Sequence, residues 1–180
     1  MPKTSVNKAL NTLKLLRQIT ESNDVPQTKL NKIMQIICEQ SNSDVASCFI
    51  FINNQLELFS ATNNYSNLEH KFFIRSGEGI IGESFQSRRT LSTPDINNNS
   101  TSTNYPQSIK DYPSIASTPL IRWSRAIGVL VLQRQNNKEY SLSEIETIET
   151  LAMVLSDIIT SDEINKYIDN IGAKRKNIGD

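Results

Sequence analysis

The sequence predicts an α+β protein built around an antiparallel sheet. Amphipathic helical patterns occupy both ends of the chain, whereas its middle is rich in β-branched and aromatic residues. Two pairs of strand-like segments are each joined by a tight turn, and strands joined in this way run antiparallel. Helices at the two ends of a sequence can pack together on one face of such a sheet. We therefore expect the terminal helices to lie together on one face of this sheet.

Residues 1–43 are expected to form two helices. The first carries an apolar stripe with helical spacing, at Val6, Leu10, Leu13, Leu16 and Ile19. Asn-Asp-Val-Pro at 23–26 ends this helix. A second stripe predicts a helix that ends near Ser41, and its members are Leu30, Ile33, Met34 and Ile37.

Residues 44–160 are expected to form the core of the domain. Two segments, 45–52 and 55–61, alternate like strands on either side of Asn53-Asn54, which predicts a hairpin. A short strand at 72–75, a helix of about two turns at 82–89 and a strand at 90–93 follow.

A long polar loop then covers 94–113. Loops of this length are uncommon in compact domains unless they have a function. The segments 116–122 and 126–134 predict a second hairpin, and the continuous apolar run IGVLVL indicates a central strand that is covered on both faces.

The last helix is expected to begin with a capping box of Ser143 and Glu146, with Leu142 as a hydrophobic staple. Its apolar stripe thins after Thr160, so residues 161–180 are expected to be a helical extension or linker. Apolar residues that lie beyond the reach of the sheet, Ile164, Tyr167 and Ile168, predict a homodimer formed through the terminal helices.

The stretch GEGIIG at 77–82 has the spacing of a dinucleotide-binding fingerprint. The strand before it carries charges, no second βαβ unit follows, and Glu78 would repel a pyrophosphate. We therefore interpret Gly77 and Gly79 as positions of positive φ in a sharp turn, Glu78 as a favourable charge at a helix N-terminus, and Gly82 as a position that lets the short helix lie close to the sheet.

Composition excludes several classes of function. Lys+Arg and Asp+Glu both number 19, which argues against a nucleic-acid or anionic-membrane partner. Cys38 and Cys48 occupy apolar patterns and, with the single histidine, His70, do not make a zinc site. No signal peptide or spanning segment is evident, so a cytoplasmic location is expected. We expect no catalytic centre, no metal and no cofactor.

The segments HKFFIRSGEGIIGE, IGVLVLQRQ and ETLAMVLSDII resemble GAF domains, small-molecule sensor modules related in fold to PAS domains. They are most similar to the N-terminal GAF domain of nitrogen-type phosphoenolpyruvate–protein phosphotransferases. The resemblance implies helices on one face of the sheet, a ligand pocket under loops on the other face, and a separate catalytic domain as partner. The residues that match recurrent positions of that family are His70, Asp95, Tyr112, Ser114, Pro119 and Gln133. The loop from Ile96 onward departs from the family pattern.

The ligand pocket is expected between the central sheet and the loop at 94–113. Its candidate residues are Ser47, Phe49, Phe51, Asp95, Tyr105, Tyr112, Ser114 and Ser117. Asp95 would accept from an ammonium group and the serines would bond an amide or carboxylate, while the phenylalanines form the floor.

The sequence thus predicts a sensor that binds glutamine or a similar small amino acid, glutamine being implied by the resemblance. Two alternatives stay open: an interaction or dimerisation module without a ligand, and a cyclic-nucleotide sensor. Against the cyclic-nucleotide alternative, the loop at 94–113 contains no arginine that could hold a phosphate.

Overall fold

The computed structural model describes residues 3–62, 68–98 and 105–176, and it confirms the predicted α+β fold. Six strands form one sheet in the order β3-β2-β1-β6-β5-β4, and every neighbouring pair is antiparallel. The strands are β1 (Val45–Ile52), β2 (Gln55–Ala61), β3 (Phe73–Ile74), β4 (Leu91–Thr93), β5 (Ser114–Arg122) and β6 (Arg125–Arg134). As the run IGVLVL predicted, β6 lies in the middle of the sheet between β1 and β5.

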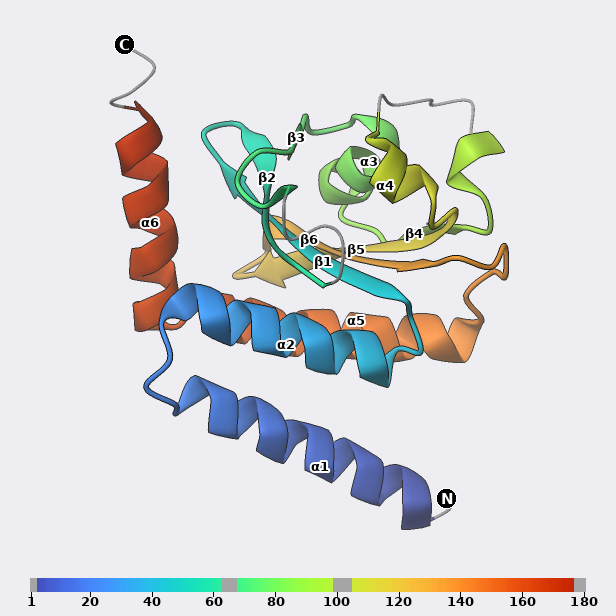
Figure 1. Cartoon of the computed structure of the whole chain (residues 1–180), viewed down its shortest axis with the longest axis horizontal. Coiled ribbons are helices and arrows are strands. Elements are labelled where there is room, and N and C mark those ends of the chain that lie inside the picture. Colours follow the sequence, from blue (N-terminus) through green and yellow to red (C-terminus); the bar gives the residue numbers. More distant parts are fainter. Residues whose placement is uncertain (1–2, 63–67, 99–104, 177–180) are drawn as a thin grey trace.

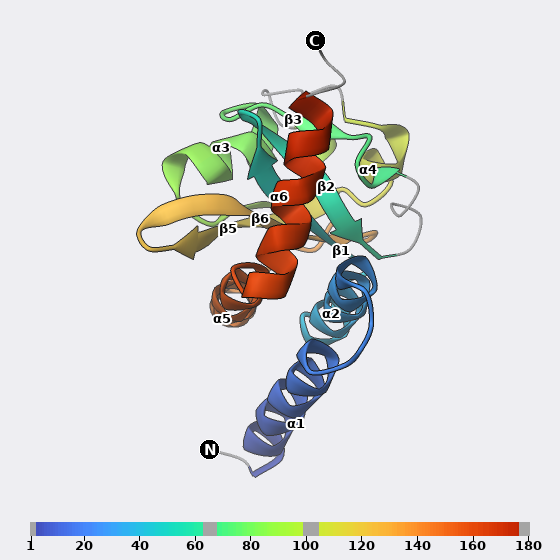
Figure 2. The ribbon, with the colours of Figure 1, turned by 90° about the vertical axis from the view of Figure 1, so that its left-hand side faces the viewer.

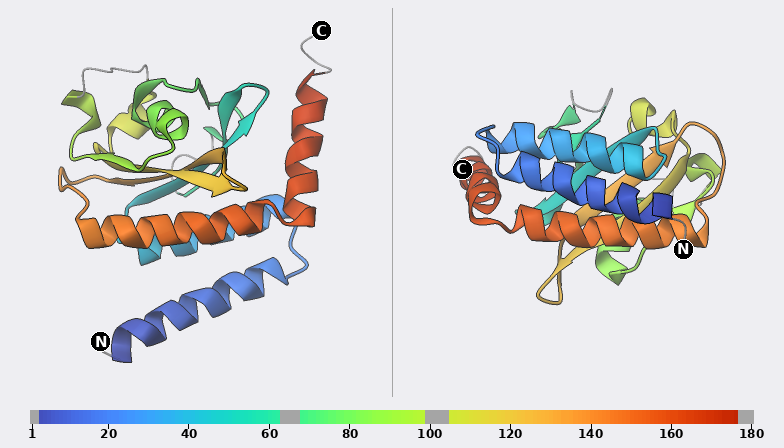
Figure 3. Two further views of the ribbon diagram at one scale, coloured as in Figure 1. Left: turned by 180° about the vertical axis from the view of Figure 1, so that it is seen from behind. Right: turned by 90° about the horizontal axis from the view of Figure 1, so that it is seen from below.

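The helices separate onto the two faces of the sheet (Figure 1). One face carries α2 (Pro26–Gln40) and α5 (Leu142–Ile159), and α1 (Lys3–Thr20) lies beneath them as an outer layer (Figure 3). The opposite face carries α3 (Gly79–Ser87), the short 3₁₀ helix Ile96–Asn98 and α4 (Gln107–Lys110). The second face is the one on which the resemblance to GAF domains placed the ligand loops. Residues 99–104 of the predicted loop lie outside the described part of the chain.

Each face of the sheet has its own hydrophobic core, because successive side chains of a strand point to opposite faces. The helix-side core combines strand residues such as Cys48 and Leu130 with the inner stripes of α2 and α5. The loop-side core joins strand residues such as Phe49 and Val131 to Ile81 of α3 and Ile109 of α4. The sheet is therefore the shared wall between two apolar compartments.

The start of α5 differs from the expected one. Ser141 is the N-cap, and it forms a capping box with Glu144. The backbone N–H of Glu144 donates to the hydroxyl of Ser141, and the backbone N–H of Ser141 donates to the carboxylate of Glu144. The box predicted from Ser143 and Glu146 is therefore wrong by two residues. The predicted staple is also wrong, since Leu142 is 86% exposed.

The C-terminal extension is a helix of its own, α6 (Asp162–Lys176), which turns away from α5 and stands across the end of the sheet (Figure 2). It is docked by an ion pair between Glu163 and the buried Lys29, with 2.6 Å between Oε2 and Nζ. Ile164 and Ile168 are buried in the helix-side core of the same chain. Their assignment to a dimer interface was therefore wrong, because α6 folds back onto its own domain.

Candidate functional site

The GEGIIG stretch forms the turn between β3 and α3, and its backbone groups bond one another. Gly77 and Gly79 have φ of 82° and 59°, as predicted. The N–H of Gly77 donates to the carbonyl of Gly82 at 2.9 Å, and the N–H of Gly82 donates to the carbonyl of Glu78 at 3.0 Å. The carboxylate of Glu78, the N-cap of α3, accepts from the N–H of Arg75. These amides are therefore engaged within the turn, unlike those of a phosphate-binding loop.

Gly82 is required by a close approach, although to this turn rather than to the sheet. A Cβ at position 82 would lie 2.3 Å from the carbonyl oxygen of Arg75 and 3.0 Å from the nitrogen of Gly77. The glycines thus position α3 over the loop-side face of the sheet.

The floor of the candidate pocket is the loop-side face of the sheet beneath α3 and α4. Ser47 and Ser117 flank Val131 in register and give this floor a row of small polar and apolar groups. Phe49 is buried beside them and meets Phe72 edge to face, with ring centroids 6.0 Å apart. Phe51 stacks on Phe85 of α3 at 4.6 Å. The three residues predicted from β1 therefore do lie toward the loop side.

The loop is fastened to this floor by a buried glutamine. The amide nitrogen of Gln133 donates to the carbonyl of Ile109 at 2.9 Å and to that of Tyr112 at 2.8 Å. Both carbonyls belong to the α4 segment, so one β6 side chain holds this segment over the sheet. The resemblance to GAF domains assigned Gln133 a family position but no role. A polar side chain that closes a continuous apolar strand is the signal that marks it.

Asp95 lies near the start of the loop, and Tyr105 is the first residue that the structure describes after the gap at 99–104. The Asp95 carboxylate accepts from the backbone N–H of Asn97 at 2.9 Å and from the side-chain amide of Asn98 at 2.7 Å. It therefore caps the 3₁₀ turn. Tyr105 is buried against Phe72, and its hydroxyl accepts from the N–H of Ile81 at 3.5 Å.

Ser114 is not brought to the pocket. It is buried, and its hydroxyl donates to the carbonyl of Lys138 at 2.6 Å. Ser114 and Ser117 are an odd number of residues apart on one strand, so their side chains point to opposite faces. This spacing was visible in the sequence.

His70 belongs to a polar network at the other edge of the sheet. Its Nδ1 lies 2.7 Å from Oε1 of the buried Glu57, and its Nε2 lies 3.2 Å from Oε1 of Gln27. The same oxygen of Gln27 accepts from the hydroxyl of Tyr167 in α6 at 2.8 Å. His70 therefore connects β2, α2 and α6 rather than lining the loop-side compartment.

Both cysteines lie in the helix-side core, as their apolar patterns predicted. Burial raises the pKa of the Cys48 thiol to about 12 and also raises that of Cys38. A cysteine nucleophile needs a lowered pKa and access to solvent, and neither thiol has them.

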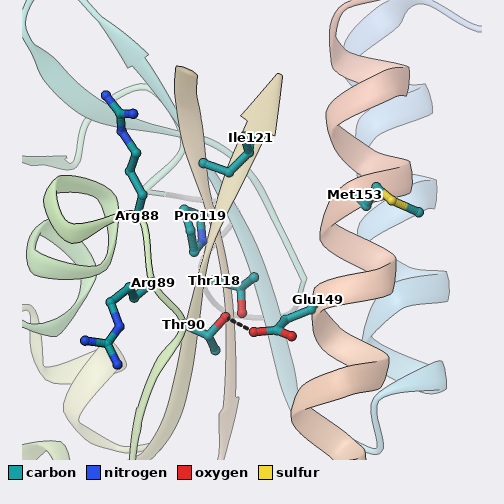
Figure 4. Close-up of a pocket in the computed structure, with 8 residues that line it drawn as sticks. All are labelled: Arg88, Arg89, Thr90, Thr118, Pro119, Ile121, Glu149 and Met153. Carbon is teal, nitrogen blue, oxygen red and sulfur yellow. Dashed lines mark hydrogen bonds between the residues drawn. The ribbon is translucent and has the colours of Figure 1, made fainter. Parts of the chain in front are cut away.

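A second hollow lies outside the predicted site, at the edge of the sheet where β4 stops pairing with β5. It has a volume of about 660 Å³ and runs between the end of α3 and α5. In Figure 4, Arg88 and Arg89 lie on the α3 side, Glu149 and Met153 on α5, and Thr118, Pro119 and Ile121 between them. We call it the β5-edge groove. Nothing in the sequence patterns pointed to it, because its residues come from three separated segments.

The fold is an α+β module in which an antiparallel sheet is backed by terminal helices on one face and covered by α3, α4 and loops on the other. A family model described as "GAF domain" matches residues 27–160. The chain belongs to the GAF domain family.

Solved structures agree with this assignment. The chain is 25% identical to the GAF domain of a phosphoenolpyruvate-protein phosphotransferase from Coxiella burnetii, with a TM-score of 0.71 over 84% of this chain and 94% of that one. It is 16% identical to the GAF domain of the Acinetobacter phosphoenolpyruvate-protein phosphotransferase, with a TM-score of 0.72 over 88% and 94%.

The fold is also that of a free methionine-R-sulfoxide reductase from Neisseria meningitidis, at 16% identity and a TM-score of 0.68 over 89% of this chain and 93% of that one. No curated protein matches the chain in sequence. Within the described residues, no helix is both long and apolar enough to span a bilayer.

Proposed function

We propose that this GAF domain is a regulatory sensor that controls a phosphoenolpyruvate–protein phosphotransferase domain in the cytoplasm by binding glutamine or a similar small amino acid. The observation that carries the proposal is the similarity to the Coxiella phosphotransferase GAF domain, which extends over 94% of that domain. The loop-side geometry supports it. Ser47 and Ser117 share a floor, and Gln133 holds a loop segment above them.

Ligand binding in this compartment requires the loop to open. The carboxylate of Asp95 would exchange its bonds to Asn97 and Asn98 for an ammonium group, and Tyr105 and Tyr112 would cover the ligand. A buried zwitterion needs partners for both charges, because each unpaired charge costs several kcal/mol. The hydroxyl of Ser117 supplies one of these partners. It is buried and has no hydrogen-bond partner among the described residues.

Glutamine at about a hundredfold excess over its dissociation constant is expected to raise the free energy of unfolding by about 2.7 kcal/mol. It is also expected to slow hydrogen exchange at residues 95–117. The Asp95→Asn variant keeps acceptor and donor atoms at the turn but removes the charge, so it should fold normally and lose the shift. If millimolar glutamine changes neither the melting temperature nor the exchange of the intact protein, glutamine sensing is wrong.

One observation favours the alternative of an interaction module without a ligand. The loop-side compartment is filled by its own apolar core, which includes Phe49, Ile81 and Val131. A domain whose interior is filled in this way would act by contacting other domains or a second copy of itself. Its melting temperature would not change with any amino acid, but it would still associate with itself.

We propose that such association is a homodimer through α1. Leu10 and Leu13 are 50% and 53% exposed on this helix. Leu13 also lines an apolar groove of about 380 Å³ that α1 forms with α5 and the end of α2. A second copy of α1 and its groove would cover these leucines, because burying apolar surface stabilises by about 25 cal/mol per Å².

Light scattering is expected to give twice the 20.3 kDa mass of one chain, and the double variant Leu10→Glu/Leu13→Glu should give the monomer mass. Trp123→Asn, which removes an exposed apolar side chain elsewhere, should leave the dimer mass unchanged. A concentrated wild-type sample that scatters as a monomer would contradict the proposal.

A further inference from the structure

Among the described residues, the most exposed aromatic side chain lies at the tip of the β5–β6 hairpin. Trp123 is 77% exposed, and this hairpin extends outward past α5 (Figures 2 and 3). Trp123 and Ser124 have φ of 46° and 60°, the left-handed conformation of a two-residue hairpin turn. Such turns favour Asn-Gly, and a bulky residue is disfavoured there. Neither packing nor turn geometry therefore accounts for a tryptophan at this position.

The tip is held in place by arginines. The guanidinium of Arg122 lies over the Trp123 ring, 5.0 Å from its centroid, and its Nη1 pairs with Oδ1 of Asp157 in α5 at 2.5 Å. Nη1 of Arg88 donates to the carbonyl of Ser124 at 3.2 Å, which ties the tip to the end of α3. A side chain that is ordered before binding loses less entropy when a partner docks.

The β5-edge groove lies next to this tip. Ile121 and Met153, 38% and 62% exposed, line it, and Pro119 forms part of its floor. The pairing of β4 with β5 ends at Ser117, and Pro119 has no N–H to offer a further strand. The groove therefore suits an inserted side chain better than an added β-strand.

The surroundings of the groove are basic. Arg88 and Arg89 line the groove, and Arg122 and Arg125 flank the two turn residues of the tip. Two carboxylates belong to the same surface: Glu149 lines the groove and Asp157 pairs with Arg122. Both carboxylates already have partners, since Glu149 accepts from the hydroxyl of Thr90 at 2.7 Å and Asp157 pairs with Arg122. Within the described residues, Arg89 and Arg125 form no ion pair. The charge left over is positive, which complements an acidic partner.

We propose that the hairpin tip and the β5-edge groove form a docking surface for an acidic protein segment that carries one large apolar side chain. The apolar side chain enters the groove beside Ile121 and Met153, and Trp123 covers it. Acidic residues on either side of the anchor meet Arg89 and Arg125. Tryptophan and arginine are the residues that most often dominate the binding energy of interfaces. This surface is separate from the loop-side compartment and does not depend on glutamine sensing.

A selection of short random peptides on the immobilised protein tests the proposal. The enriched peptides are expected to be acidic with a single large apolar residue. When one of them is titrated, the emission of Trp123 should shift to shorter wavelength as the ring is covered, and this signal is specific because the chain has one tryptophan. Affinity should fall as salt is raised from roughly 50 mM to 300 mM, because screening weakens exposed charge pairs.

Two variants locate the binding. Trp123→Asn places a residue suited to the left-handed turn, so the fold should be retained while affinity falls at least about tenfold. Arg89→Glu/Arg125→Glu should have an effect of similar size. The control Lys71→Glu/Lys138→Glu makes the same change in net charge at exposed positions away from the tip and should bind like the wild type.

The proposal is overturned if no peptide is enriched, if the enriched peptides have no acidic bias, or if either test variant binds them as tightly as the wild type does. It is also overturned if Trp123→Asn converts a dimer to a monomer, because the surface would then be an interface between two copies of this chain.

Discussion

Replacing Gly128 by alanine is expected to lower the free energy of unfolding by at least about 3 kcal/mol, at the upper end of the range for overpacked cores. Gly128 lies in β6, where it pairs with Ile50 of β1 and Leu120 of β5. A Cβ at this position would lie 2.1 Å from the carbonyl oxygen of Phe49 and 3.2 Å from the Cα of Ile50. Both are backbone atoms of a central strand, so relief requires breaking the β1–β6 ladder. Urea denaturation of the purified variant measures the loss.

Gly172→Ala is the matched control. This glycine lies in α6, and its added Cβ would meet only side-chain carbons of Ile52, at 3.6 to 3.9 Å, which is ordinary contact. Alanine in a helix interior is favoured over glycine by about 1 kcal/mol, so this variant should be unchanged or more stable. If the free energy of unfolding of Gly128→Ala lies within about 1 kcal/mol of the wild-type value, the close approach of β1 and β6 at Gly128 is wrong.

Replacing Arg134 by methionine is expected to destabilise the protein by about 3 kcal/mol, the lower end of the range for removing one partner of a buried ion pair, because Arg134 is buried while Glu144 is partly exposed. The buried guanidinium donates to the carbonyls of Ser41 and Asn42 and, at 2.6 Å, to Oε1 of Glu144. It also lies over the Tyr140 ring, 4.0 Å from the centroid. One side chain thus joins the end of β6, the end of α2 and the N-terminus of α5. Arg125→Met, at the exposed end of the same strand, should change stability by no more than about 0.5 kcal/mol.

The same contact predicts an acid dependence. The hydrogen bond from Arg134, aided by those from Ser141, lowers the pKa of Glu144 from 4.5 to about 2. A carboxyl with a lowered pKa in the folded state stabilises the protein above pH 4.5, and this contribution is lost as the pH falls from 4.5 to 2. Because Glu144 is partly exposed, the loss should amount to about 1–2 kcal/mol. Arg134→Met should lose less stability than the wild type over this interval; equal losses would show that Arg134 does not set this pKa.

Ambiguities in the sequence explain the errors made at the C-terminal end. Ser141-x-x-Glu144 and Ser143-x-x-Glu146 both satisfy the capping-box pattern, and the sequence alone does not rank them. The structure selects Ser141 because Glu144 is also the carboxylate that reaches Arg134. Likewise, the spacing of Ile164 and Ile168 indicates that these residues are covered but not by which molecule. The turn after Thr160 directs them onto their own domain.

In the candidate pocket, too, the sequence predicted some positions and the tertiary structure alone decided others. Alternation along β1 placed Ser47, Phe49 and Phe51 on the loop side, and the structure agrees. The amide bonds of Gln133, however, depend on where the α4 segment crosses the sheet, and that position follows from packing between residues distant in the chain.

The sequence by itself determined the order of the six strands and of α1, α2, α3 and α5, the two hairpins, the antiparallel sheet, the structural role of GEGIIG and the resemblance to GAF domains. These properties depend on near neighbours, because periodicity, turn residues and charges next to the glycines act within a few residues. The tertiary structure alone decided how α6 docks, which carboxylate meets Arg134, and that Arg88, Pro119, Ile121 and Met153 line one groove. Such groupings depend on contacts between distant segments, and no local pattern encodes which buried surfaces will meet.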